Sequence, residues 1–217
     1  MKSRSEAEDH LRVIRSLMER ATIYRAISAP TALAGGLLAV ATSAAIWWSD
    51  QRDAPGFDAR LFAEIWLVIL AVVLAINAFF VRREARRDGR VFLSSGARLA
   101  LRAVAPCLIL PGATTIWFFK NAAPIDKEIL VAVWIIFYGL SLLATALFAP
   151  RSLVMLGWAF LLSGVVYLFW PKSFLTDSHG LVPNLAMGFT FGLYHLVYAI
   201  CVWPRRAIAD DEILAVE

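Results

Sequence analysis

Residues Arg82–Arg90 read RREARRDGR and lie between two long apolar runs, Ile65–Val81 and Ala103–Phe119. Five of these nine residues are arginines. Basic residues that flank a membrane-spanning helix stay on the cytoplasmic side, because Lys and Arg resist translocation. The stretch therefore predicts a cytoplasmic connection between two spanning helices, and it sets the direction of every other segment.

The composition also indicates a membrane protein. Hydrophobic residues make up 60% of the 217 residues and charged residues 18%, whereas soluble domains average roughly 45–50% and about 25%. A helix needs about 17–25 apolar residues to cross the hydrocarbon core of a bilayer. Stretches of about this length without Asp, Glu, Lys or Arg predict an all-α bundle of six transmembrane helices: Ala26–Ser49, Ile65–Val81, Ala103–Phe119, Ile129–Pro150, Ser152–Pro171 and Gly180–Pro204.

The segment before the first apolar run has the pattern of an amphipathic helix, Ser5–Ile27. Ser5 and Glu8 match the capping box that begins many helices. Apolar residues recur at spacings of three and four, among them Leu11, Ile14 and Met18, and form one face. We expect a helix that either lies in the headgroup plane or packs on a partner helix.

These patterns divide the chain into a cytoplasmic amphipathic helix (1–27), a six-helix transmembrane domain (28–204) and a short cytoplasmic tail (205–217). In the resulting topology, 16 of the 21 Lys and Arg residues fall on the side of Arg82–Arg90 and five on the other. That bias predicts that both termini are cytoplasmic. The small size and the arginine-rich composition favour a multi-pass protein of a bacterial cell inner membrane.

A weak internal repeat is visible. An Ala-Pro pair followed by glycine occurs at or near the start of three helices, at Ala29-Pro30, Ala105-Pro106 and Ala149-Pro150. This pattern suggests three parallel helical hairpins. The alternative is that Pro and Gly are simply frequent in membrane helices.

Known catalytic signatures are missing from the sequence, including Gly-x-Ser-x-Gly, His-Glu-x-x-His, a Walker loop and Cys-x-x-Cys. Three histidines in the whole chain do not suggest a metal cage or a haem with two axial histidines. Cys107 and Cys201 both fall inside apolar runs, so a disulfide framework is not predicted. We therefore predict no metal, no cofactor and no nucleic-acid partner, and we favour a non-enzymatic protein.

The last apolar run contains the most polar features. Gly188 and Gly192 form a small-x-x-x-small pair, which allows close approach of a neighbouring helix. On a regular α-helix, His195 and Tyr198 extend this face, and Tyr194 lies beside it. An ionisable residue within a spanning helix is a candidate functional site by default.

The third apolar run contains Pro106 and Pro111, each of which removes an intrahelical hydrogen bond. By residue count these prolines and His195 lie at similar depth. Freed carbonyls beside a titratable imidazole are typical of transporter sites built on interrupted helices. The structural alternative is a kinked helix beside a histidine that hydrogen-bonds to a neighbour. Asn77 is a further polar candidate in the membrane interior.

Two functions follow from these features. The leading hypothesis is a non-enzymatic membrane module that engages a partner through its N-terminal helix and its arginine-rich cytoplasmic face. The alternative is a small-solute or ion transporter or channel-like protein with a midplane site near His195 and the proline-broken third helix. The pattern is compatible with a membrane or cytoplasmic protein partner and with a homo-oligomer, beside the lipid bilayer itself. The predicted contacts to anionic lipid or to a partner are Arg82, Arg83, Arg86, Arg87 and Arg90.

Overall fold

The computed structural model describes residues 29–50, 59–87, 95–120, 126–147, 149–169 and 181–203. Within these ranges the chain is helical and contains no strand, which confirms the predicted all-α class. The amphipathic segment 1–27 and the tail 205–217 lie outside the described residues. The helices are α2 (Ala29–Asp50), α3 (Ala59–Arg87), α4 (Ser95–Lys120), α5 (Lys127–Leu143), α6 (Arg151–Phe169), α7 (Leu181–Met187) and the π-helical η2 (Gly188–Tyr194).

Each of the six predicted apolar runs forms a helix. By length and composition, α2, α3, α4, α6 and the continuous helix Leu181–Trp203 could cross a membrane. We call Leu181–Trp203 the last helix; it comprises α7, η2 and a final α-helical part. The remaining helix, α5, has 17 residues, at the short end of the range of about 17–25 residues that a span needs.

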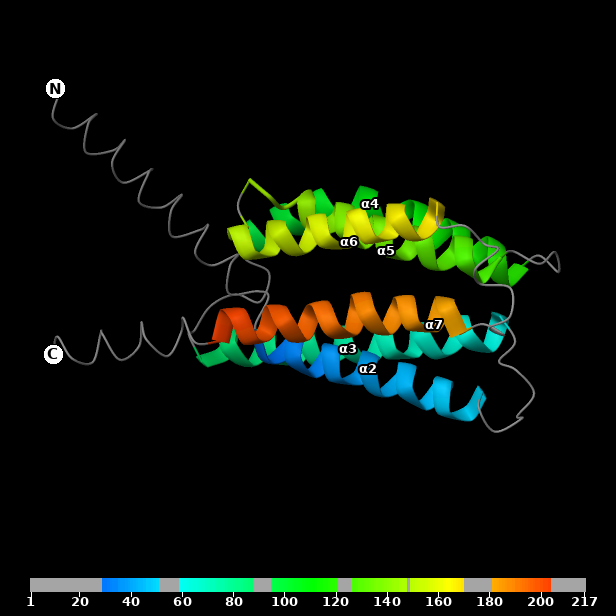
Figure 1. The fold of residues 1–217 in the computed structure, drawn as a ribbon. Coiled ribbons are helices and arrows are strands. Elements are labelled where there is room, and N and C mark those ends of the chain that lie inside the picture. The colour runs from blue at the N-terminus through cyan, green and yellow to red at the C-terminus, as the bar shows by residue number, and fades with distance from the viewer. Residues whose placement is uncertain are drawn as a thin grey trace, which may run out of the picture.

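The helices form two layers that run along a common axis (Figure 1). One layer contains α4, α5 and α6, and the other contains α2, α3 and the last helix. The main packing pairs are α5 with α6 and the last helix with α2. Because α6 and the last helix belong to different layers, the packing does not follow the three hairpins suggested by the Ala-Pro repeat.

Glycines permit the close approach within each pair. A Cβ atom at Gly139 of α5 would lie 2.6 Å from the backbone nitrogen of Leu161 in α6. A Cβ atom at Gly192 would lie 2.6 Å from Cγ2 of Val40 in α2, and one at Gly188 would clash with Ser43. The prediction that Gly188 and Gly192 allow a close helix contact is therefore confirmed.

Two reciprocal hydrogen bonds strengthen the pair of α2 and the last helix. The Ser43 hydroxyl donates to the carbonyl oxygen of Asn184 at 3.1 Å, and the Asn184 amide donates to the carbonyl oxygen of Ser43 at 2.9 Å. Both residues are buried. Buried polar groups in folded proteins are usually paired in this way.

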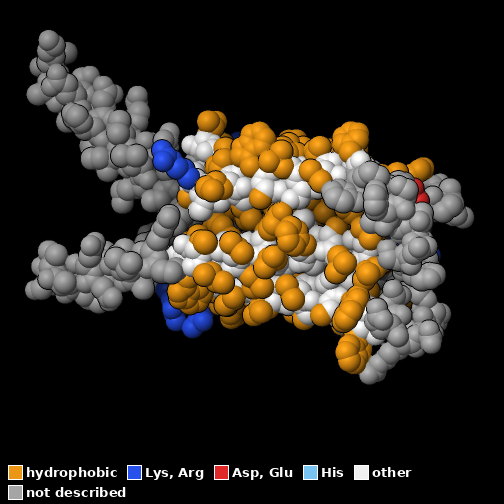
Figure 2. Space-filling view, in the orientation of Figure 1, with side chains coloured by type: hydrophobic (Ala, Val, Ile, Leu, Met, Phe, Trp, Pro, Cys, Tyr) orange, Lys and Arg blue, Asp and Glu red, His pale blue; other side chains and the backbone are white. Residues whose placement is uncertain are grey.

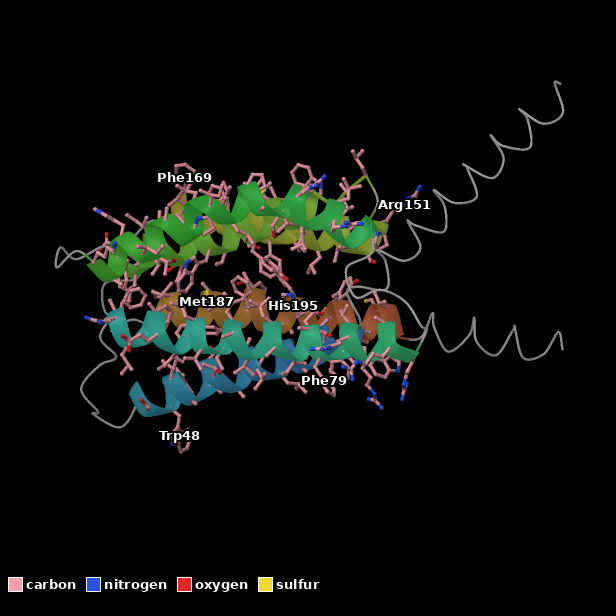
Figure 3. All side chains as sticks on the ribbon, turned by 180° about the vertical axis from the view of Figure 1, so that it is seen from behind. Trp48, Phe79, Arg151, Phe169, Met187 and His195 are labelled. Atoms are coloured by element: carbon pink, nitrogen blue, oxygen red, sulfur yellow. The ribbon has the colours of Figure 1, made fainter. Side chains whose placement is uncertain are left out.

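The apolar core lies between the layers, and α3 joins it only through its first turns. Phe62 and Trp66 of α3 are buried with Val131 and Ile135 of α5 and with Phe160 of α6. Further along α3 the side chains become exposed, as Phe79 illustrates (Figure 3). Beyond Trp66 no described residue of α3 is buried, and the far half of the helix packs only in part, with Val73 beside Gly35 of α2.

Basic side chains gather at one end of the bundle (Figure 2). We call it the arginine end; there α3 ends, α4 and α6 begin, and exposed arginines gather. These arginines are Arg82, Arg83, Arg86, Arg87, Arg98, Arg102 and Arg151. The opposite end has charges of both signs, including an ion pair between Arg60 and Glu64 at 3.1 Å.

Candidate functional site

His195 lies between the two layers (Figure 3) and uses both ring nitrogens. Nδ1 lies 2.9 Å from the carbonyl oxygen of Phe191, and Nε2 lies 2.8 Å from the hydroxyl oxygen of Tyr138 in α5. A carbonyl only accepts hydrogen bonds, so Nδ1 must carry a hydrogen. In the neutral imidazole Nε2 then has a lone pair and accepts the Tyr138 hydroxyl hydrogen. The histidine therefore joins its own helix to the other layer.

Tyr194, the preceding residue, makes a second bond between the layers. Its hydroxyl oxygen lies 2.6 Å from the hydroxyl oxygen of Ser163 in α6. Adjacent residues of the last helix thus bind the two neighbouring helices of the other layer. The aromatic ring of Phe160 fills the space between these bonds, with centroids 4.7 Å from Tyr138 and 5.5 Å from His195. We call this group the interlayer cluster: Tyr138, Phe160, Ser163, Phe191, Tyr194 and His195.

The π-helical segment η2 orients the cluster. A π-helix bonds residue i to i+5 and so takes more residues per turn than an α-helix. The expectation that Gly188, Gly192 and His195 share one face is therefore wrong. The two glycines face α2, whereas His195 faces α5. Within the segment, the Thr190 hydroxyl donates to the carbonyl oxygen of Ala186 at 2.7 Å.

The predicted proline site lies elsewhere. Pro106 is exposed and Pro111 is buried, yet α4 stays α-helical from Ser95 to Lys120. The helix packs mainly against α5, on the flank of the bundle. Because both ring nitrogens of His195 are occupied by Tyr138 and Phe191, the carbonyls around Pro106 and Pro111 are not its partners.

Threonines accompany the buried proline. The Thr115 hydroxyl donates to the carbonyl oxygen of Pro111 at 2.6 Å and accepts the indole N–H of Trp134 in α5 at 2.9 Å. The Thr114 hydroxyl lies 3.0 Å from the carbonyl oxygens of both Leu110 and Pro111. Such bonds to the preceding turn satisfy helical carbonyls locally.

Of the other predicted interior residues, Tyr198 is buried in the core. Asn77 is half-buried on α3. Tyr138 and Ser163 were missed by the sequence analysis. Both are polar residues near the middle of charge-free runs, a signal that could have marked them beside His195.

Four of the five arginines predicted to contact lipid or a partner are exposed in the structure. Arg82, Arg83, Arg86 and Arg87 are all exposed at the end of α3, whereas Arg90 lies outside the described residues. Arg98 and Arg102, at the start of α4, extend this surface and were not part of the prediction.

The interactions that the structure shows in the interlayer cluster are hydrogen bonds and aromatic contacts. Over the parts of the chain that the structure describes, no three His, Cys, Asp or Glu side chains gather to hold a metal ion. The imidazole has its two partners, and aromatic rings surround it. The arrangement can fix the two layers relative to each other and hold a proton at Nδ1.

A scan against protein-family models, a search of curated proteins and a search of solved structures each found no match to this chain.

Proposed function

We propose that this chain is a multi-pass membrane protein of the bacterial inner membrane, with six spanning helices and with both termini and the arginine end in the cytoplasm. We further propose that it is a non-enzymatic module, which engages a protein partner through its N-terminal amphipathic segment and its arginine-rich face. The observation that supports this proposal is the gathering of seven exposed arginines at one end of the bundle. A one-sided excess of basic residues is the pattern that orients membrane proteins.

The way the layers pack favours a docking role over chemistry. The polar side chains that meet between the layers, Tyr138 with His195 and Ser163 with Tyr194, bond to each other. These bonds satisfy the polar groups between the layers without any ligand. The exposed charge at the arginine end, in contrast, is available to a partner.

Reporter fusions test the orientation. A reporter fused to the C-terminus should report a cytoplasmic location, and one inserted after Gly56 should report an external location. Export of the C-terminal reporter would contradict the six-helix topology.

A spin-label experiment tests whether the N-terminal segment binds a protein or lipid partner. A cysteine in place of His10 carries a spin label, and Leu11, Ile14 and Met18 are replaced together by Asp. The triple change should release the label from its protein or lipid contact, because the apolar face is lost. Ser16→Asp, on the opposite side of the helix predicted for this segment, is the control and should leave the label bound. A label that is equally mobile in all three proteins would contradict the proposed role of the segment.

A second candidate is a small-solute or ion transporter or channel-like protein. The observation that favours it is a polar contact between two separately packed helix layers, in which Tyr194 and His195 reach two different helices. Many transporters alternate by rocking one helix group against another around a central site. This candidate places the site on α5, α6 and the last helix, away from Pro106 and Pro111.

His195→Gln separates the two candidates. Thermal stability in detergent is measured beside the cellular phenotype of a deletion strain that expresses the variant. A transporter should lose function while the protein still folds and inserts. Loss of function only in proportion to the folded protein that remains would make His195 structural and would remove the main support for transport.

A further inference from the structure

Six of the exposed arginines occur as pairs four residues apart. Two pairs lie on α3, Arg82 with Arg86 and Arg83 with Arg87. The third pair, Arg98 with Arg102, lies at the start of α4. Residues four apart are neighbours on the surface of a helix, so each pair places two guanidinium groups side by side.

Pairs of like charge at this spacing destabilise a helix unless an anion lies between them. The end of α3 has four arginines and a single glutamate, Glu84, in the sequence RREARR. Within the residues that the structure describes, the ion pair between Arg60 and Glu64 lies at the opposite end of the bundle. The paired guanidinium groups therefore favour an external anion, and their planar geometry suits a bidentate contact with phosphate oxygens.

The depth of the pairs identifies the source of the phosphate. Arg82 directly follows the apolar run that ends at Val81, and Arg102 directly precedes the run that begins at Ala103. Four residues of helix rise about 6 Å. The headgroup layer of one leaflet is about 5–7 Å thick, the difference between a bilayer of about 40–45 Å and its core of about 30 Å. Each pair therefore spans the headgroup layer, with one arginine at its inner edge and one at its outer edge.

We propose that these three arginine pairs bind the phosphate groups of anionic phospholipids in the leaflet at the arginine end. This proposal rests on the membrane orientation stated above, and it assigns a lipid contact to the three pairs beside the protein contact proposed for the N-terminal segment and the arginine-rich face. The lipid contributes negative charge that offsets the excess of arginine over acidic residues at the end of α3 and the start of α4. It also anchors the far part of α3, whose side chains lie outside the bundle core.

The test uses the full-length protein purified in a mild detergent, with phosphatidylglycerol as the probe. Binding is measured by native mass spectrometry and by the rise in melting temperature as lipid is added. Replacing both members of one pair by Gln should weaken binding roughly 30-fold, because each basic residue near an anionic surface contributes about 1 kcal/mol. The matched control is Lys120→Gln with Lys127→Gln, which removes the same charge at the opposite end and should leave binding unchanged.

A second variant set separates specific sites from general charge. Arg82→Lys with Arg86→Lys keeps the basic residues that orient the protein, but lysine cannot make the bidentate contact. We expect this variant to insert normally and to bind phosphatidylglycerol several-fold more weakly. Equal binding by the lysine and arginine forms would overturn the proposal in favour of diffuse attraction.

Three further measurements identify the ligand. Zwitterionic phosphatidylcholine and inorganic phosphate should each raise the melting temperature much less than phosphatidylglycerol; an equal effect of either would overturn the lipid assignment. A poly-glutamate peptide that binds more tightly than the lipid would show that the surface serves an acidic protein instead. Fusion reporters on the same variants distinguish a failed lipid site from a failed orientation, because a reversed reporter contradicts the topology and a loss of lipid binding does not.

Discussion

The fourth and the last helices differ in a way that the sequence does not suggest. The sequence of α4 contains two prolines, yet the helix remains α-helical over Ser95–Lys120 and lies on the flank of the bundle. The last helix has its one proline, Pro183, in the first turn, yet it contains the π-helical segment Gly188–Tyr194 and makes the hydrogen bonds between the layers. The more irregular sequence thus forms the more regular helix.

The reason lies in what surrounds each helix. A helix on the flank of the bundle can accommodate proline through local adjustments of its backbone, and α4 stays α-helical through both prolines. The last helix is held on two sides, by α2 at Gly192 and by α5 at His195. A π-helical turn satisfies both contacts because its extra residue per turn separates the two faces. Tertiary contacts, rather than local breakers, therefore determine where the helix departs from regularity.

The largest expected effect is that of a glycine-to-leucine substitution in the last helix, and the same substitution in α4 is its control. Gly192→Leu should destabilise the protein by about 3 kcal/mol, the upper part of the range for overpacking. Its Cβ atom alone would lie 2.6 Å from Val40 Cγ2, and the remaining leucine atoms have no space against α2. The measurement is the melting temperature in detergent, together with the yield of folded protein.

Gly112→Leu in α4 is the matched control. No heavy atom lies within 4 Å of a Cβ atom built at Gly112, so the side chain extends away from the protein. Its stability should stay within about 0.5 kcal/mol of the parent, as for most surface substitutions. Similar losses in both variants would show that α4 is also packed on this face and would remove the contrast between the two helices.

The sequence predicts local features of the helices better than it predicts the contacts between the two layers. Charges bound each apolar run, and α2, α6 and the last helix begin and end within three residues of their runs. By contrast, α3 extends six residues beyond its run at each end, α4 begins eight residues before its run, and α5 ends seven residues before the end of its run. The glycine pair at Gly188 and Gly192 also predicted a close contact correctly. The bond between Tyr138 and His195 joins residues 57 positions apart, and it depends on the arrangement of the two layers. Local periodicity has no information on that arrangement, and it also assumes an α-helical turn where η2 is π-helical.

An intermediate effect is expected for Tyr138→Phe. This change leaves Nε2 of His195 without its hydrogen-bond donor in a partly buried site, which should cost about 1–2 kcal/mol. Tyr167→Phe is the matched control, because the buried hydroxyl of Tyr167 has no partner among the described residues. Removing an unpaired hydroxyl should be neutral or slightly stabilising. The melting temperatures of both variants are compared, and equal losses would contradict the pairing of Tyr138 with His195.

The smallest expected effect concerns the bond between α4 and α5. Thr115→Val and Trp134→Phe each remove one partner of the 2.9 Å hydrogen bond between these helices. A double-mutant cycle isolates the coupling between the two side chains, since each single change also has effects of its own. We expect a coupling of about 0.6 kcal/mol, the average for hydrogen bonds between membrane helices. The Thr115 hydroxyl keeps its bond to Pro111 when Trp134 is changed, so the threonine is not left unsatisfied.

The same cycle on Tyr138→Phe and His195→Gln should give a larger value, because aromatic rings enclose that pair between the layers. Equal couplings in the two cycles would mean that α4 is tied to the bundle as firmly as the last helix, and the distinction between a flanking and a central helix would then rest on packing alone.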